Sequence, residues 1–264
     1  MAGFTAKDVQ SLRQATGVGM LDAKRALQES GGDMDAAKRW LREKGLAERG
    51  KRAEREASQG AVAVVRADTV AAIVELRCET DFVAKADGFV ALADELAEAV
   101  AAKGEQAVEG LADEVARLAT TLKENISVGR VVRLEAGEDE VIDTYLHQQA
   151  GRGVNAVGVV LRGGSAALAH DVAVHVAFAR PSYLRREDVP EAEVADERAT
   201  VEAISRAEGK PEAALPKIVE GRMNGWYRER VLVEQPYAKD EKQTVGALLG
   251  SAEVVRFAQV VVGS

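Results

Sequence analysis

The sequence has few of the residues with which proteins build covalent cross-links or metal sites. Among 264 residues there is a single cysteine, Cys78, so no disulfide can form within the chain, and this cysteine usage fits a reducing compartment. The three histidines, His147, His170 and His175, form neither a His-Glu-x-x-His motif nor a Cys/His cluster of the kind that binds zinc. We therefore expect no metal and no other cofactor.

Long apolar runs and an excess of basic residues are also missing. No stretch approaches about 18 consecutive apolar residues, and the first ten residues lack the apolar core of a secretory signal. The net charge is −8, opposite in sign to the basic surface that neutralises nucleic-acid phosphates. These features predict a cytoplasmic protein that contacts neither membranes nor nucleic acid directly.

Catalytic motifs are absent as well. The sequence contains no Gly-x-Ser-x-Gly nucleophile elbow and no phosphate-binding loop ending in Gly-Lys-Ser or Gly-Lys-Thr. Cys78 lies in a predicted strand with the alternation of a buried residue, which disfavours a nucleophilic role. The missing motifs weaken the case for an enzyme but leave that class open, and we expect a protein that is not an enzyme.

The amino-terminal region, residues 1–45, carries three short helical patterns separated by glycines. Thr5 and Asp8 have the spacing of a capping box at the start of the first helix, and Gly45 is expected to close the third. The pattern predicts a compact three-helix bundle similar to ubiquitin-associated domains, a common protein-binding module. Residues 46–58 are charged without an apolar face, which is typical of a solvated linker or an exposed helix.

The remainder of the chain predicts an α+β fold with antiparallel sheets in two subdomains, residues 59–136 and 137–264. The first has the order of two strands, two helices and one strand, and the second echoes it with late closing strands at 231–234 and 254–262. An insertion at about 188–226 carries two apolar stripes around a Gly-Lys-Pro turn. It predicts a projecting antiparallel helical hairpin that either packs within the chain or serves as a docking or dimer arm.

One stretch combines an acid and a large aromatic side chain at the end of a predicted strand. The strand alternation breaks off at Thr80 and Asp81, and a helix follows. If the strand continued, Phe82 would share a side with Leu76 and Cys78, and the pattern alone favours burial of this ring in the core. If the strand ends at Thr80, Phe82 projects instead.

Several segments are similar to bacterial elongation factor Ts, the family of nucleotide exchange factors for elongation factor Tu. The run Thr16-Gly17-Val18-Gly19-Met20-Leu21-Asp22-Ala23-Lys24-Arg25-Ala26-Leu27 resembles the amino-terminal signature of that family. The run Cys78-Glu79-Thr80-Asp81-Phe82-Val83-Ala84-Lys85 resembles its second signature. Shorter matches follow in the family's order at residues 175–177, 187–190 and 219–223.

The resemblance implies a guanine nucleotide exchange factor of translation elongation that binds GDP-bound and nucleotide-free elongation factor Tu. In the family, a phenylalanine wedges between helices of the partner's nucleotide-binding domain and shifts the groups that hold Mg²⁺, so that GDP leaves. Thr80, Asp81, Phe82 and Val83 match this element, which reverses the core interpretation of Phe82. Loss of Mg²⁺ weakens the hold on the diphosphate because the ion is often the largest local charge in such a site.

Further positions match residues with which the family contacts its partner. Arg13, Met20, Leu21 and Lys24 match bundle positions that grip the nucleotide-binding domain, although Leu21 could equally belong to the bundle core. His147 matches a histidine near the site, or is a strand-end histidine with satisfied hydrogen bonds. The second subdomain would hold the partner's distal domain, and the formation of a homodimer or a 2:2 complex is left open.

Lys123 and residues 148–154 depart from the family pattern: Lys123 stands where the family usually has glycine, and residues 148–154 do not match. The runner-up function is a non-exchanging scaffold that binds proteins through its bundle and helical hairpin, and an unrecognised enzyme is the third alternative. The exchange factor and the scaffold differ in whether GDP release from the partner is accelerated.

Overall fold

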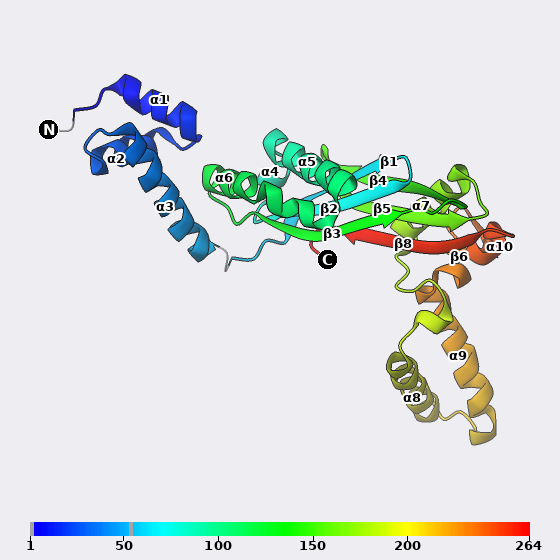
Figure 1. Cartoon of the computed structure of the whole chain (residues 1–264). Coiled ribbons are helices and arrows are strands. Elements are labelled where there is room, and N and C mark those ends of the chain that lie inside the picture. Colours follow the sequence, from blue (N-terminus) through cyan, green and yellow to red (C-terminus); the bar gives the residue numbers. More distant parts are fainter. Residues whose placement is uncertain (1–2, 53–54) are drawn as a thin grey trace.

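A computed structural model describes residues 3–52 and 55–264, with the side chains described outside 45–54. The chain forms a helical bundle at its amino-terminal end and then a layered body built on two sheets. A helical hairpin projects away from this body (Figure 1). The mixed helical and antiparallel architecture confirms the predicted α+β class.

The bundle consists of α1 (Ala6–Thr16), α2 (Met20–Glu29) and α3 (Met34–Arg52). Thr5 caps α1 in the predicted capping box, in which the Asp8 carboxylate accepts from the Thr5 backbone N–H at 2.7 Å. Leu12 and Leu27 are fully buried at the centre of its core. The expected helix end at Gly45 is wrong, since α3 continues to Arg52. The interior glycines of α3, Gly45 and Gly50, each cost the helix only about 1 kcal/mol, and the residues around them are mostly good helix formers.

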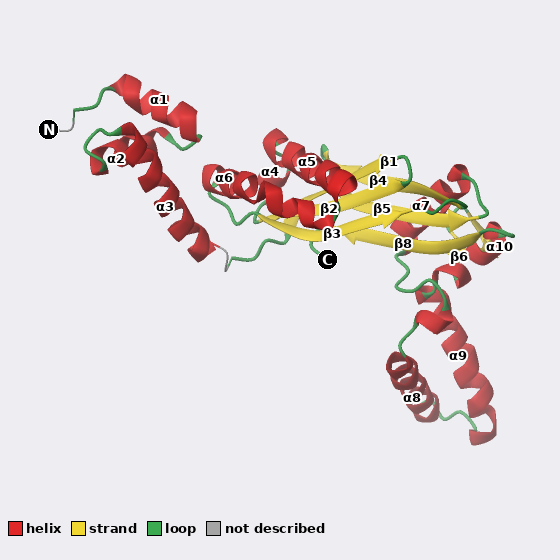
Figure 2. Cartoon of the chain, viewed as in Figure 1, coloured by secondary structure: helices red, strands yellow, loops and turns green. Residues whose placement is uncertain are grey.

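Two three-stranded antiparallel sheets form the centre of the body (Figure 2). The first has the order β1-β2-β3, and its strands are β1 (Gln59–Ala67), β2 (Val70–Cys78) and β3 (Ser127–Glu135). The second has the order β4-β5-β8, and its strands are β4 (Glu140–Gln149), β5 (Arg152–Arg162) and β8 (Glu253–Val261). The sheets pack face to face through small aliphatic side chains such as Ala71, Ile73 and Val160.

Helices cover the outer faces of both sheets. The first sheet carries α5 (Asp87–Lys103), the 3-10 helix η1 (Glu105–Leu111) and α6 (Ala112–Leu122), and Phe89 and Leu96 of α5 are fully buried in the core that they share with the sheet. The second sheet carries α7 (Ala166–Ala179). Because side chains alternate along a strand, Val74 and Leu76 of β2 face the helices while Ile73 faces the second sheet. Both faces of β2 are therefore buried.

The projecting hairpin is built from α8 (Glu191–Ala207) and α9 (Leu215–Arg230), as the apolar stripes predicted. Its buried seam contains Val201, Val219 and Met223, whereas Ile204 of α8 is 45% exposed. Short elements complete the chain: η2 (Arg186–Asp188), η3 (Glu212–Ala214), η4 (Leu232–Glu234), β6 (Pro236–Tyr237), β7 (Asp240–Thr244) and α10 (Val245–Leu249). The strand expected at 231–234 is wrong because a 3-10 turn occupies these residues, with only a bridge from Val231 to Tyr183.

Candidate functional site

The Phe82 turn, residues 80–85, follows directly after β2. The strand ends at Cys78, and Thr80 caps the single-turn helix α4 (Asp81–Ala84), its hydroxyl accepting from the Val83 backbone N–H at 3.4 Å. Successive side chains of a helical turn point in different directions, so Ala84 is buried while Phe82 is 83% exposed. The core interpretation of Phe82 is wrong, because the strand that would have buried the ring stops before it.

The backbone before Phe82 is held by one carboxylate from the connection between α6 and β3. Oε2 of Glu124 accepts from the backbone N–H groups of Glu79 and Thr80, both at 3.1 Å, and Oε1 accepts from the Thr80 hydroxyl at 2.5 Å. In return, the Asn125 backbone N–H donates to Oε1 of Glu79 at 2.6 Å. Hydrogen bonds to a carboxylate are among the stronger ones in proteins, so this connection fixes where the turn begins.

Asp81 lies beside the exposed ring with its carboxylate paired. The Lys85 ammonium donates to it at 2.5 Å, and this hydrogen bond is the main cause that holds the pKa of Asp81 below its usual range. The side chain is nevertheless 46% exposed. The turn therefore presents an apolar ring next to a charged hydrogen-bond acceptor.

Two further contacts fix the underside of the turn. The thiol of Cys78 donates to the Thr80 carbonyl at 3.2 Å, and burial is the main cause that raises the pKa of this thiol to about 12. The thiol therefore stays protonated and acts as a packed donor, not a nucleophile. From the second sheet, Nη1 of Arg152 donates to the Asp81 carbonyl at 3.4 Å.

The predicted bundle residues lie on its surface. Leu21 is 81% exposed and Met20 51%, and Arg13 and Lys24 are also exposed, whereas Leu27 is fully buried. The core interpretation of Leu21 is therefore wrong. Exposed large apolar side chains at the start of α2 are available for contact with another molecule.

The α6–β3 connection also reaches the bundle. Nζ of Lys123 lies 3.0 Å from the Asp22 carboxylate of α2, and the next residue, Glu124, holds the Phe82 turn. Lys123 ends α6 in the left-handed conformation with φ of 60°, which explains why glycine suits this position. The start of α2 and the Phe82 turn are thus both joined to adjacent residues of one connection.

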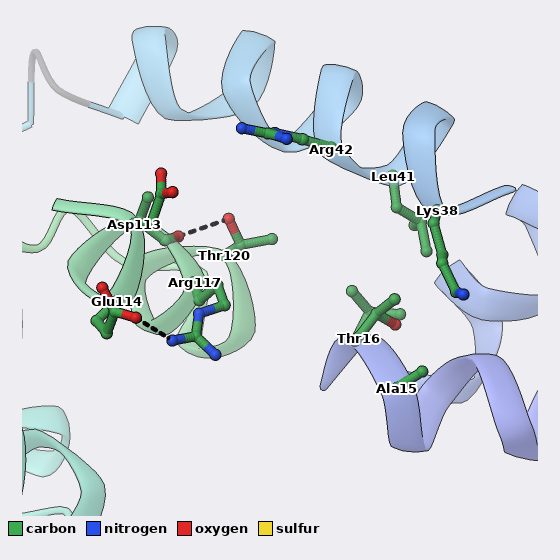
Figure 3. Close-up of a pocket in the computed structure, with 11 residues that line it drawn as sticks. Ala15, Thr16, Lys38, Leu41, Arg42, Asp113, Glu114, Arg117 and Thr120 are labelled. Atoms are coloured by element: carbon green, nitrogen blue, oxygen red, sulfur yellow. Dashed lines mark hydrogen bonds and ion pairs between the residues drawn. The ribbon is translucent and has the colours of Figure 1, made fainter. Parts of the chain in front are cut away.

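Elsewhere the bundle approaches the body across an open space of about 620 Å³ (Figure 3). Lys38 and Arg42 of α3 line one side, and Asp113 and Glu114 of α6 line the other. Glu114 pairs with Arg117 of its own helix at 2.6 Å and not with the bundle. The bundle and α6 therefore meet through a sparsely packed, charged boundary.

His147 lies near the end of β4 and is exposed. It lines a groove of about 790 Å³ together with Arg152 and with Phe178 of α7, whose ring is 79% exposed. Within the described part of the chain no hydrogen bond satisfies the His147 ring, so the alternative of a satisfied strand-end histidine is not supported. Arg152 belongs to this groove and also bonds to Asp81, so the groove adjoins the Phe82 turn.

Three residues of this region were missed by sequence reasoning: Glu124, Arg152 and Phe178. The first two act across 44 and 71 positions of sequence, and no local pattern indicates such partners. Phe178 lies in a predominantly apolar helix, so the pattern does not indicate which of its apolar side chains faces solvent.

An exposed aromatic ring on a turn held by distant segments is the geometry of a preorganised contact element. Among the described side chains, those of residues 3–44 and 55–264, no group of three or more His, Cys, Asp and Glu residues could hold a metal ion. Within the described part of the chain, no helix is both long and apolar enough to cross a membrane. The fold and site define an α+β protein that presents a fixed aromatic side chain on its surface.

Comparison with known proteins identifies the family. A profile described as Elongation factor TS matches residues 79–264. Over full length, the chain is 44% identical to elongation factor Ts of Micrococcus luteus, covering 100% of both chains. It is 46% identical to that of Clavibacter sepedonicus, again over 100% of both, and 45% identical to that of Mycobacterium bovis BCG, covering 100% of this chain and 99% of the relative. The chain belongs to the elongation factor Ts family.

Proposed function

We propose that this protein is the guanine nucleotide exchange factor of elongation factor Tu. It binds the GDP-bound partner, inserts Phe82 into the nucleotide-binding domain, displaces the groups that hold Mg²⁺, and promotes GDP release so that GTP can bind. The family membership and the second signature, residues 78–85, support this assignment.

The observation that carries the proposal is the exposure of Phe82 on a fixed backbone. Full burial of such a ring in a partner contributes about 1.5–3 kcal/mol of apolar transfer free energy. The turn is already held by Glu124, Arg152 and its own cap, so little conformational freedom is lost on insertion. Binding energy is then available to distort the partner.

Exchange by this route needs no catalytic acid or base. The factor and GDP oppose each other's binding to the partner, and linkage requires that each weakens the other by the same factor. The wedge acts on Mg²⁺ because the ion neutralises the diphosphate, and its displacement lowers the affinity for GDP. The side chains of this protein supply position and apolar surface.

The remaining surface residues would hold the partner while the wedge acts. In this proposal the bundle, residues 1–45, contacts the nucleotide-binding domain through Arg13, Met20, Leu21 and Lys24. His147 and the groove beside it contact the partner from the second subdomain, residues 137–264. The exposure of these side chains supports the assignment.

The test is the release of a fluorescent GDP from elongation factor Tu, followed by stopped flow at increasing factor concentration. We expect the native chain to accelerate release and Phe82→Ala to lower the maximal rate strongly while still binding. Ile204→Ala, which truncates an exposed apolar side chain on the projecting hairpin, is the control and should exchange normally. If the native chain binds the partner without changing the release rate, the scaffold alternative holds instead.

A further inference from the structure

We propose that Arg152 is a positioning residue for exchange: from the second sheet it sets the direction in which Phe82 projects. The inference rests on the proposed function, because it assigns how the wedge of that function is aimed. Arg152 lies in the segment that departs from the family pattern, and no sequence motif predicts a role for it.

The hairpin that carries Arg152 has a defined backbone. Ala150 and Gly151 connect β4 to β5 with φ values of 52° and 80°, as a two-residue turn with two positive φ angles requires. Arg152 follows at once and pairs in register with Gln149. Its side chain therefore leaves the strand from a fixed point.

The guanidinium lies between the two sheets at the base of the Phe82 turn. Nη1 donates to the Asp81 carbonyl at 3.4 Å, and Nη2 donates to Oε1 of Gln59 at the start of β1 at 3.5 Å. The residue is only 8% exposed, and its Nε has no hydrogen-bond partner. Within the described residues no carboxylate forms an ion pair with Arg152.

Such a placement is unfavourable for stability alone. A buried charge without an ion-pair partner is costly, and apolar residues of similar size often stabilise a protein as well or better. The two hydrogen bonds are long, and one buried donor is unsatisfied. A role outside stability accounts for a charged side chain that reaches the carbonyl of the residue immediately before Phe82.

Arg152 and Glu124 hold consecutive residues of the turn from two different segments, the start of β5 and the connection between α6 and β3. Glu124 binds the backbone N–H of Thr80, and Arg152 binds the carbonyl of Asp81. Glu124 sets where the turn begins, while Arg152 orients the peptide that leads into Phe82. Since Arg152 also lines the groove beside His147, a partner seated there contacts the same side chain that aims the wedge.

The experiment compares Arg152→Gln with native protein in stopped-flow GDP release, and measures affinity and the rate at saturating factor separately. Arg162→Gln is the matched control, because Arg162 ends the same strand and pairs with Glu140 and Glu253, away from the Phe82 turn. We expect Arg152→Gln to lower the saturating rate about five- to tenfold, in line with the loss of a charge-assisted hydrogen bond, with a smaller change in affinity. The control should change neither quantity.

A double-mutant cycle with Phe82→Ala separates positioning from general destabilisation. If Arg152 acts through the ring, Arg152→Gln has no further effect on the saturating rate once the ring is absent. Equal effects in both backgrounds, or an unchanged saturating rate, would overturn the inference. If Arg152→Gln does not fold, Arg152→Lys replaces it in the same double-mutant cycle. We expect Arg152→Lys to lower the saturating rate of GDP release in part, and to have no effect on that rate in the Phe82→Ala background. If native protein does not accelerate GDP release at all, the proposed function itself fails. If native protein accelerates release and Arg152→Gln does so at the same saturating rate, only this inference is rejected.

Discussion

The hydroxyl of Thr80 donates a 2.5 Å hydrogen bond to Oε1 of Glu124, which joins the start of the Phe82 turn to the connection between α6 and β3. The other oxygen of the same carboxylate accepts from two backbone N–H groups. Glu124 is thus the residue that converts a strand end into a fixed turn.

Replacement of Glu124 by glutamine should loosen this turn. The amide has one acceptor oxygen in place of two and no negative charge, so the charge assistance of all three bonds is lost. We expect the free energy of unfolding to fall by about 1–3 kcal/mol, measured by urea denaturation, with slower GDP release. Glu114→Gln, which breaks only the surface pair with Arg117, should change stability by less than about 0.5 kcal/mol. Equal losses in the two variants would contradict the bracing role.

The two phenylalanines Phe82 and Phe89 should respond oppositely to truncation. Phe82 is 83% exposed, so Phe82→Ala should leave stability within about 0.5 kcal/mol of native while it impairs exchange. Phe89 is fully buried between α5 and the first sheet, and Phe89→Ala should destabilise by about 3–5 kcal/mol. Thermal and urea unfolding of both variants check this contrast. A large loss of stability in Phe82→Ala would indicate that the Phe82 ring is buried in the core.

In the bundle, Leu21 and Leu27 form a similar pair. Leu21→Ala removes an exposed side chain and should weaken binding to elongation factor Tu with no loss of helical structure. Leu27→Ala opens a cavity in a small core and should destabilise the bundle by about 2–5 kcal/mol. Titration calorimetry with the partner and circular dichroism of the free variants distinguish the two effects. If Leu21→Ala binds elongation factor Tu with the affinity of the native protein, Leu21 is not part of the contact surface.

Lys123→Gly should stabilise the body. Lys123 has φ of 60°, a conformation unfavourable for residues with a Cβ by about 1 kcal/mol. The variant also loses the exposed ion pair with Asp22, which contributes little at the surface. A rise in the unfolding midpoint is expected, and Lys123→Ala, which loses the same ion pair but keeps the strained backbone, should show none. A lower midpoint for the glycine variant would show that the ion pair dominates.

His175 should make stability fall in mild acid. Its ring is fully buried, its Nε2 bonds to Oε1 of Gln235 at 3.0 Å, and its Nδ1 accepts from the Ala238 backbone N–H at 3.2 Å. Burial is the main cause that lowers the pKa of His175, so below about pH 6.5 the unfolded chain binds a proton that the folded chain does not. The free energy of unfolding should therefore decrease as the pH falls through this range. Urea titrations at several pH values give the free energy of unfolding as a function of pH. We expect the same decrease in acid for native protein and for His147→Gln, and a smaller decrease for His175→Gln.

Local patterns were sufficient for most elements of the fold. The capping box at Thr5 and Asp8, the two strands that open the first subdomain and the helical hairpin of α8 and α9 follow from local patterns, because each depends on residues close in sequence. The errors occurred where the local signal is ambiguous. The pattern at Val231-Leu232-Val233 predicts a strand, but these residues lie in a tight turn. The pattern also predicts a helix end at Gly45, but α3 continues beyond it.

Residue patterns alone predicted the α+β class, the family and a functional role for Thr80-Asp81-Phe82-Val83. The exposure of Phe82 emerges in the tertiary structure, because the direction of this side chain depends on where β2 stops and on how the next turn is held. The groups that hold this turn, Glu124 and Arg152, come from residues 44 and 71 positions away. Hydrogen bonds between segments that distant are set by the packing of the two sheets and their connections, and no local pattern encodes them.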